Sequence, residues 1–277
     1  MGVLGRNGAG KTTLTRLIGG LERPDAGVLS ILGDAAVPRA GRLRLRCAVA
    51  MDAPAHWEAL TGRQNLWFFG RQYGLSGPVL CRRVDELLDL ADLTDQADEP
   101  VGVYSFGMRR KLNIIEALVY DCDLLVLDEP SAGADTNFLD RLVTVIRRRC
   151  EEGRTTWIAD NDADWLARVA TDAILLEDGR IAAAGSVPGL VASLPARSRI
   201  EILLERTGSA AVPDIPGVSR YQCASNRITA DLSDSDKLPA ELLAWVTANG
   251  GRVKSMEIRS MTLHEALLQS RIAGDRP

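Results

Sequence analysis

Short apolar runs alternate with amphipathic stretches over residues 1–190. The apolar runs hold too few residues for a helix and are typical of strands buried on both faces. In the amphipathic stretches, apolar residues recur every three or four positions, which predicts helices. We expect strands at Gly2–Leu4, Val28–Leu32, Leu124–Leu127, Thr155–Ala159, Ala173–Glu177 and Arg180–Ala184, and helices over residues 11–19, 61–93 with a break at Gly77-Pro78, 105–119, 136–152 and 164–170. This alternation predicts an α/β fold, with a mainly parallel sheet covered by helices on both faces.

The dipeptide Asp178-Gly179 separates the last two of these strands. Both residue types tolerate a positive φ, so the pair predicts a type I′ hairpin turn.

Beyond residue 190 the pattern changes to shorter elements that are punctuated by prolines. The expected strands are Arg199–Glu205, Arg227–Leu232 and Arg252–Ile258, and the expected helices are Leu238–Ala248 and Thr262–Arg271. We therefore expect two domains, one over residues 1–190 and a small α+β domain over residues 197–277.

The composition of the 277 residues, 46% hydrophobic and 25% charged, is typical of a globular protein. No run of about 18 apolar residues occurs, so we expect no membrane-spanning helix. A net charge of −4 argues against nucleic acid as a partner, and we interpret the local basic runs as solvated surface faces. These runs are Arg42/Arg44/Arg46, Arg109–Lys111 and Arg147–Arg149. Five scattered cysteines without a CxxC pair favour reduced thiols over disulfides or a zinc site.

Residues 5–12 fit the phosphate-loop pattern G-x-x-x-x-G-K-[ST]. Glycines let the backbone curl around phosphates, and the following helix offers its N-terminal N–H groups and positive dipole end. Lys11 would contact the β- and γ-phosphates of ATP, and the Thr12 hydroxyl would bind Mg²⁺. The residues expected to bind nucleotide here are Gly5, Asn7, Gly8, Ala9, Gly10, Lys11, Thr12 and Thr13.

The apolar strand at Leu124–Leu127 ends in two carboxylates, Asp128 and Glu129. Asp128 would face the crevice where open α/β sheets bind ligands, and there it would hold the metal. Glu129 is placed to polarise the attacking water as a general base.

Tyr104-Ser105-Phe106-Gly107-Met108-Arg109 lies shortly before this strand, at the start of an expected helix. By itself it is an ordinary helix N-cap with exposed N–H groups. Together with the phosphate loop and the carboxylates it resembles the signature motif of ABC transporter ATPases. Ser131–Asp135 resembles that family's D-loop. Its helical subdomain is matched by Leu60-Thr61, Asn65-Leu66 and Tyr73–Leu75. Met261–Leu268 resembles part of the accessory domain of daunorubicin-resistance drug exporters.

The resemblance implies a P-loop ATPase core with a helical subdomain at about residues 52–120. It also implies a head-to-tail dimer, in which Ser105 and Gly107 of one subunit cap the ATP held by the other. The expected partners are a second ATP-binding subunit, the same or different, and a separate integral membrane permease contacted by residues 52–90. Such subunits are cytoplasmic and peripheral on the inner face of the membrane.

Two positions depart from the family pattern. Asp52 stands where the family has a glutamine that binds the metal; it keeps an oxygen ligand but loses the amide donor. Asn161 stands where a histidine contacts the γ-phosphate, and it cannot become a cation. The expected metal ligands are thus Thr12, Asp52 and Asp128, and the expected catalytic residues are Glu129 and Asn161. We expect slow hydrolysis, or one degenerate site in a mixed dimer, and we expect His56 and His264 to be surface or packing residues.

The chain begins at the phosphate loop, without the strands and the adenine-stacking aromatic residue that precede it in the family. We expect a truncated gene model whose true start lies upstream. Three functions stay open: export driven by ATP hydrolysis, a degenerate regulatory subunit that binds ATP without hydrolysing it, and a soluble ABC protein acting on ribosomes or DNA. The third generally needs two nucleotide-binding domains or a long coiled coil, and neither is present.

Overall fold

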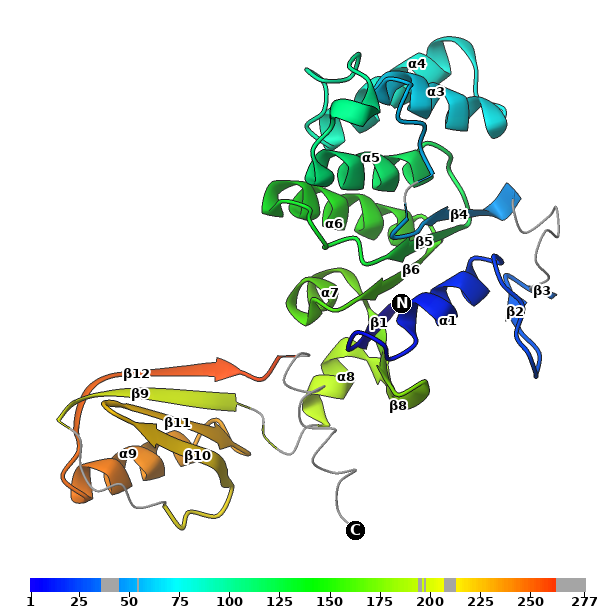
Figure 1. Cartoon of the computed structure of the whole chain (residues 1–277). Coiled ribbons are helices and arrows are strands. Elements are labelled where there is room, and N and C mark those ends of the chain that lie inside the picture. Colours follow the sequence, from blue (N-terminus) through cyan, green and yellow to red (C-terminus); the bar gives the residue numbers. More distant parts are fainter. Residues whose placement is uncertain (36–44, 54, 194–195, 197, 207–212, 263–277) are drawn as a thin grey trace. The chain divides into compact units, whose positions relative to one another are not determined.

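The computed structural model describes residues 1–35, 45–53, 55–193, 196, 198–206 and 213–262 (Figure 1). The chain forms two compact units, residues 1–184 and 185–277. None of the helices in these ranges is both long enough and apolar enough to cross a membrane.

A six-stranded sheet in the order β4-β5-β6-β1-β7-β8 forms the centre of the first unit. Its strands are β1 (Gly2–Gly5), β4 (Cys47–Ala50), β5 (Leu124–Asp128), β6 (Thr155–Asp160), β7 (Asp172–Glu177) and β8 (Arg180–Ser186). The pairs among β4, β5, β6, β1 and β7 are all parallel, as the alternating pattern predicts. β1 and β5 are buried along their whole length, because helices cover both faces of the sheet.

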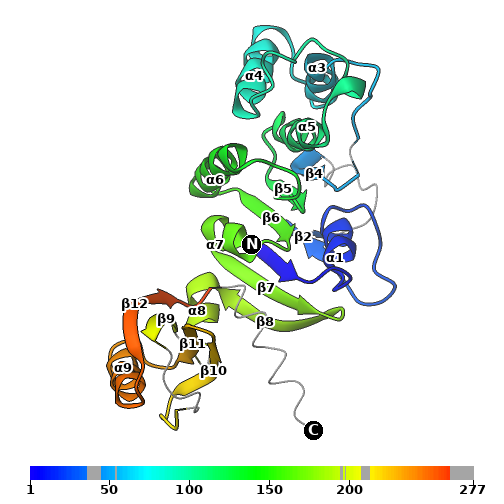
Figure 2. The same cartoon turned by 60° about the vertical axis from the view of Figure 1, so that its left-hand side comes forward.

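Helices lie on either side of this sheet, with α1 on one face and α6 and α7 on the other (Figure 2). The helices around the sheet are α1 (Lys11–Ile18), α5 (Phe106–Leu118), α6 (Thr136–Glu151) and α7 (Ala163–Val169). On the α1 side, Leu14 and Ile18 pack against a cluster that includes Val3, Val126 and Trp157. The expected strand near residues 28–32 is a two-residue strand, β2 (Ser30–Ile31), which among the described residues pairs with β3 (Asp34–Ala35).

Residues 61–104 form a helical segment above the sheet (Figure 1). Its helices are α3 (Gly62–Gln72), α4 (Gly77–Leu90) and the short 3₁₀ helix η1 (Val101–Val103). Thr61 and Gln64 form a reciprocal capping box at the start of α3, which fixes where that helix begins. The expected break within residues 61–93 is confirmed, since α4 begins at Gly77 with a positive φ of 58°.

The second unit holds a four-stranded sheet in the order β10-β11-β9-β12, and all its pairs are antiparallel. Its elements are α8 (Val187–Ala192), β9 (Ser198–Arg206), β10 (Val218–Ala224), β11 (Arg227–Leu232), α9 (Leu238–Ala248) and β12 (Arg252–Ser260). The alternating residues Ile200, Ile202 and Leu204 of β9 pack against α9 in one core. The pattern did not predict β10 and α8, and most of the helix expected at Thr262–Arg271 lies outside the described residues.

Candidate functional site

The loop between β1 and α1 forms the first part of the candidate site. Gly8 and Gly10 have φ values of 83° and 100°, in the left-handed region that favours glycine. At Gly5 a Cβ atom would come within 2.6 Å of the Leu176 carbonyl oxygen. The loop is also held from outside, because the Gly179 N–H donates to the Ala9 carbonyl at 3.0 Å. The sequence therefore curls the loop, and the neighbouring β7–β8 turn supports it.

This loop borders a cavity of about 290 Å³. The cavity is lined by Asn7, Gly8 and Gly10 of the loop, by Lys11, Thr12 and Thr13 at the start of α1, and by Glu129. N–H groups at the start of a helix together with a lysine form a site that favours an anion.

Lys11 is almost fully buried, and its ammonium group lies over the loop. Its Nζ donates to the carbonyls of Gly5 at 2.9 Å and Arg6 at 3.3 Å, and it lies 3.5 Å from Glu129 Oε1. The backbone carbonyls thus hold the ammonium where a phosphate at the loop could replace them as its partner. A cation from the start of α1 and a carboxylate from the end of β5 meet at this point.

The carboxylates at the end of β5 differ sharply in environment. Asp128 is 1% exposed, and neither of its oxygens accepts a hydrogen bond from a described residue. Burial raises the pKa of Asp128, while the nearby Thr12 hydroxyl acts in the opposite direction. Glu129 borders the cavity with a φ of 49°, and its N–H donates to the Ala159 carbonyl at 2.7 Å.

The residues around Asp128 fit a divalent cation. An ionised carboxylate that is buried without a partner is costly, and a metal ion would supply that partner. Among the described residues, no three His, Cys, Asp or Glu side chains gather in a metal-binding group. Thr12 and Asp128 could therefore supply only part of the shell, which suits a magnesium ion that keeps phosphate oxygens and waters as ligands.

Asp52, the third expected metal ligand, is not among the residues that line this cavity. Its side chain is 72% exposed and lies 3.7 Å from Nη1 of Arg110. The structure therefore pairs Asp52 with an arginine of α5.

Arg110 connects three parts of the site, a role that the sequence interpretation missed. Nη2 donates to the carbonyls of Asp128 and, at 2.6 Å, of Glu129. Nη1 donates to the carbonyls of Met51 at 3.2 Å and Asp52 at 3.4 Å. Burial lowers the pKa of Arg110, and the nearby carboxylates, first Asp52 and then Asp128, oppose that effect. One buried guanidinium thus holds the ends of β4 and β5 to α5.

The interpretation of the basic runs as solvated faces is wrong for Arg110, Lys111 and Arg149, which are all buried. Each has carbonyl or carboxylate partners that compensate for burial; Lys111, for example, lies 3.1 Å from Asp135. The sequence signal for their burial was that they lie on helical faces that also carry apolar residues.

Asn161 is exposed and follows a second buried carboxylate that the sequence interpretation also missed. Asp160 accepts hydrogen bonds from the Ser131 N–H at 3.0 Å, the Ser131 hydroxyl at 2.7 Å and the Asp162 N–H at 2.9 Å. Burial raises the pKa of Asp160, and these hydrogen bonds oppose the increase. Asp160 thereby ties the segment after Glu129 to the segment that carries Asn161. A carboxylate at the end of a buried strand was the signal for it.

Ser105 and Gly107 lie at the start of α5 and do not line the cavity in this single chain. The Ser105 hydroxyl accepts from the Met108 N–H at 3.2 Å, as expected of an N-cap. Between them Phe106 is 72% exposed, and its ring lies over Gly133, where a Cβ would come within 2.4 Å of it. The helix start is therefore not part of the cavity at this chain's own phosphate loop.

The two histidines were expected to be surface or packing residues. The side chain of His56 is 2% exposed and lies 3.7 Å from Glu116, so it is a packing residue. His264 lies outside the described residues.

Comparison with known proteins finds a matching family and related sequences. Residues 1–132 match the family model described as ABC transporter. The chain is 32% identical to the daunorubicin resistance ATP-binding protein DrrA3 of Streptomyces coeruleorubidus over 99% of this chain and 87% of that protein. It is 37% identical to the Nod factor export ATP-binding protein I of Burkholderia lata over 69% of this chain and 63% of that protein.

Solved structures show the same fold. The structure of an ATP-binding subunit of an ABC transporter matches with a TM-score of 0.63 and 27% identity, over 68% of this chain and 79% of that one. A dimeric ATP-binding cassette in a post-hydrolysis state, bound to ADP and Pi, matches with a TM-score of 0.61 and 20% identity, over 67% of this chain and 84% of that one.

Proposed function

The chain belongs to the ATP-binding proteins of the ABC transporter family, and from this premise we propose that it hydrolyses ATP to drive export through a separate membrane protein. The observation that carries the proposal is the meeting of Lys11 and Glu129, 3.5 Å apart, at a glycine loop that opens a helix. A phosphate chain bound there would lie between the cation that holds it and the carboxylate that activates water.

Binding would begin with the backbone. The N–H groups of the loop and of the first turn of α1 form a site that favours an anion, and the helix dipole adds to the attraction. Lys11 would exchange the Gly5 and Arg6 carbonyls for phosphate oxygens. Thr12 and Asp128 would hold Mg²⁺, which neutralises charge on the β- and γ-phosphates when bound.

For hydrolysis, Glu129 would act as the general base. It would accept a proton from a water molecule as that water attacks the γ-phosphorus. The positive φ of Glu129 sets the direction of its side chain, and Arg110 holds its carbonyl at 2.6 Å, so the carboxylate is positioned from behind. Asn161 could donate a hydrogen bond to the γ-phosphate but could not carry a positive charge. We propose slow turnover for this reason.

A complete site requires a second subunit. Ser105 and the exposed N–H groups at the start of α5 form an anion site that this chain's own phosphate does not occupy. We propose that they cap the nucleotide of a partner subunit, the same or different, in a head-to-tail dimer. A dimeric ATP-binding cassette has the same fold, which supports the pairing of two such subunits.

The names of the relatives point to export of small molecules. One is a daunorubicin resistance protein and another a Nod factor export protein, and the first matches along 87% of its length, the C-terminal unit included. We propose that this chain works at the cytoplasmic face of a membrane with a permease for a drug-like or antibiotic cargo.

The test measures nucleotide binding and phosphate release by the full chain, with and without Mg²⁺. Lys11→Ala should abolish saturable ATP binding, and Glu129→Gln should keep binding but remove most phosphate release. Arg16→Ala, which removes an exposed charge on the same helix α1, should change neither. Wild-type protein without saturable ATP binding would overturn the proposal.

A second function, a regulatory subunit that binds ATP without hydrolysing it, is favoured by Asp52 and Asn161. This function predicts that the wild-type chain releases no phosphate, so that Glu129→Gln leaves the rate unchanged. Slow hydrolysis predicts instead a low rate of phosphate release, which Asn161→His should increase. A rate equal to that of ordinary family members, and unaffected by Asn161→His, would refute slow hydrolysis.

A further inference from the structure

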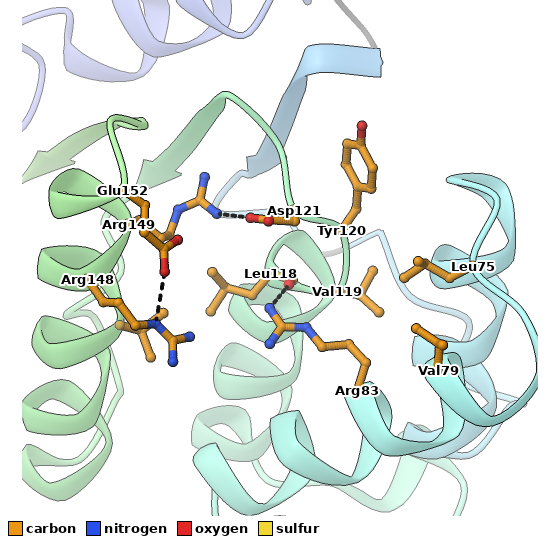
Figure 3. Close-up of a pocket in the computed structure, with 11 residues that line it drawn as sticks. Leu75, Val79, Arg83, Leu118, Val119, Tyr120, Asp121, Arg148, Arg149 and Glu152 are labelled. Carbon is orange, nitrogen blue, oxygen red and sulfur yellow. Dashed lines mark hydrogen bonds and ion pairs between the residues drawn. The ribbon is translucent and has the colours of Figure 1, made fainter.

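A second cavity, of about 340 Å³, lies between α4, the end of α5 and α6 (Figure 3). It shares no lining residue with the cavity at the phosphate loop. Its volume falls in the range of small-molecule sites. One part of its wall is apolar and is formed by Leu75, Val79, Val119 and Val145.

Three arginines line the cavity beside these apolar side chains. Arg83 comes from α4, and Arg148 and Arg149 come from α6. In Figure 3 the side chains of Arg83 and Arg148 extend toward the same space from the two helices. Like charges that approach one another across a cavity favour an anion between them.

The carboxylate partners of these arginines do not balance all of the positive charge around the cavity. Arg83 donates to the Leu118 carbonyl at 2.7 Å and lies 3.6 Å from Glu86. Arg149 pairs with Asp121 at 3.2 Å, and that carboxylate also pairs with Arg154. Arg148 lies 3.9 Å from Glu152, a loose pair between exposed side chains. With these partners included, four arginines (Arg83, Arg148, Arg149 and Arg154) face three carboxylates (Glu86, Asp121 and Glu152), so one positive charge is in excess.

Two further observations indicate that this site prefers an anion. The Nε of Arg149 is buried and has no hydrogen-bond partner in the described part of the chain. Burial lowers the pKa of Arg83, and the charges of Arg148 and Arg149 act in the same direction against Glu86. A negative charge in the cavity would relieve this repulsion.

We propose that this cavity binds a small amphipathic carboxylate. Its apolar chain would lie along Leu75, Val79, Val119 and Val145, and its carboxylate would face Arg83 and Arg148. A single negative charge matches the one positive charge in excess among these arginines and their carboxylate partners. Because α4 and α6 both contribute, the bound molecule would bridge the helical segment and the sheet-bearing part of the first unit.

The experiment is calorimetric titration of the full chain with three probes. Octanoate combines both features of the proposed ligand, acetate lacks the apolar chain, and octanol lacks the charge. We expect saturable binding of one octanoate, with acetate and octanol at least about tenfold weaker, which corresponds to about 1.4 kcal/mol. ATP should not displace octanoate, since the two cavities share no lining residue.

Variants then locate the site. Arg83→Gln and Arg148→Gln should each weaken octanoate binding about tenfold or more and leave ATP binding unchanged. Arg82→Gln removes the same charge from the neighbouring exposed position of α4 and should change neither. Should Arg83→Gln fail to fold after losing its bond to Leu118, the exposed Arg148 still provides the test.

Three results would overturn the proposal: no saturable octanoate binding, octanol binding as tightly as octanoate, or octanoate binding unchanged in Arg148→Gln. Each is distinct from failure of the proposed ATPase, which is read from ATP binding and the Lys11→Ala variant.

Discussion

The carboxylate of Asp128 is a costly group to bury in the candidate site. It is buried, neither oxygen accepts a hydrogen bond from a described residue, and burial raises its pKa above the ordinary value of 3.8. In the nucleotide-free protein the negative charge of Asp128 therefore opposes folding. In the protein with Mg·ATP bound, the same charge is needed to hold the metal. Stability and function make opposite demands on this residue.

Asp128→Asn should therefore stabilise the nucleotide-free protein and weaken Mg·ATP binding. We expect the free energy of unfolding to rise by about 1–2 kcal/mol at neutral pH. A raised pKa means that wild-type stability falls as pH rises from 3.8 to the folded-state pKa, so the gap between variant and wild type should close as pH is lowered to 3.8. Denaturant unfolding of both proteins over a pH series measures this difference in the free energy of unfolding.

Asp25→Asn, at an exposed position, is the control for the loss of one negative charge. A variant at position 128 that is less stable than wild type at neutral pH would contradict this account of Asp128.

At the scale of elements, α5 holds the sheet edge through Arg110. Its guanidinium donates to backbone carbonyls at the ends of β4 and β5, 18 to 59 residues away in sequence. Because carbonyl oxygens left unpaired in the interior are costly, these bonds should matter more than the exposed pair with Asp52.

Arg110→Gln should lower the free energy of unfolding by about 2–4 kcal/mol, and Asp52→Asn by less than about 0.5 kcal/mol. Chemical denaturation measures both, with Arg71→Gln on the exposed face of α3 as the control. A loss in Asp52→Asn equal to that in Arg110→Gln would show that the ion pair, and not the carbonyl bonds, is what stabilises this corner.

The turn between β7 and β8 also acts as an element, because it supports the phosphate loop. Asp178 and Gly179 have φ values of 46° and 75°, which confirms the expected type I′ turn. The Gly179 N–H donates to Ala9, and its Cα is 3.7 Å from where a Cβ of Gly10 would lie. A change in the turn should therefore reach the phosphate loop.

Gly179→Ala and Gly153→Ala form a matched pair. Both glycines have positive φ, 75° and 80°, with open space where a Cβ would lie, so each variant should lose about 1 kcal/mol of stability. Only Gly179→Ala should weaken ATP binding, by about threefold or more. Thermal unfolding and ATP titration measure the two effects, and equal ATP affinity in both variants would contradict the link.

At the scale of the whole molecule, the proposed head-to-tail dimer predicts complementation. Lys11→Ala disables the phosphate loop and Ser105→Arg disables the capping helix start, so each protein alone should hydrolyse little ATP. In an equal mixture, half of the dimers pair one of each and contain one intact site of two. Phosphate release should recover to about a quarter of the wild-type rate.

A mixture of Lys11→Ala with Lys11→Ala/Ser105→Arg is the control, because it contains no intact site. Recovery in that control, or no recovery in the first mixture, would refute the head-to-tail arrangement for this chain.

Much of the fold could be predicted because burial and periodicity are local properties of the chain. The apolar runs that became β1, β5 and β6 are short and flanked by turn residues, and α3 begins at a capping box readable in sequence. β4 was missed because Cys47–Ala50 consists of small residues after a basic run, without alternation. It is a strand because its partner β5 pairs with it, Cys47 beside Leu124.

The sequence alone determined the phosphate loop, the paired carboxylates and the helix cap at Ser105, since each is a group of neighbouring residues whose spacing dictates its chemistry. Only the tertiary structure decided the roles of Arg110 and Asp160, the pairing of Asp52 with an arginine, and the amphipathic cavity between α4 and α6. The physical reason is that burial and charge pairing depend on which distant segments meet. From sequence, a basic run is interpreted as a solvated face. Only the fold shows which of its residues are buried with carbonyl partners.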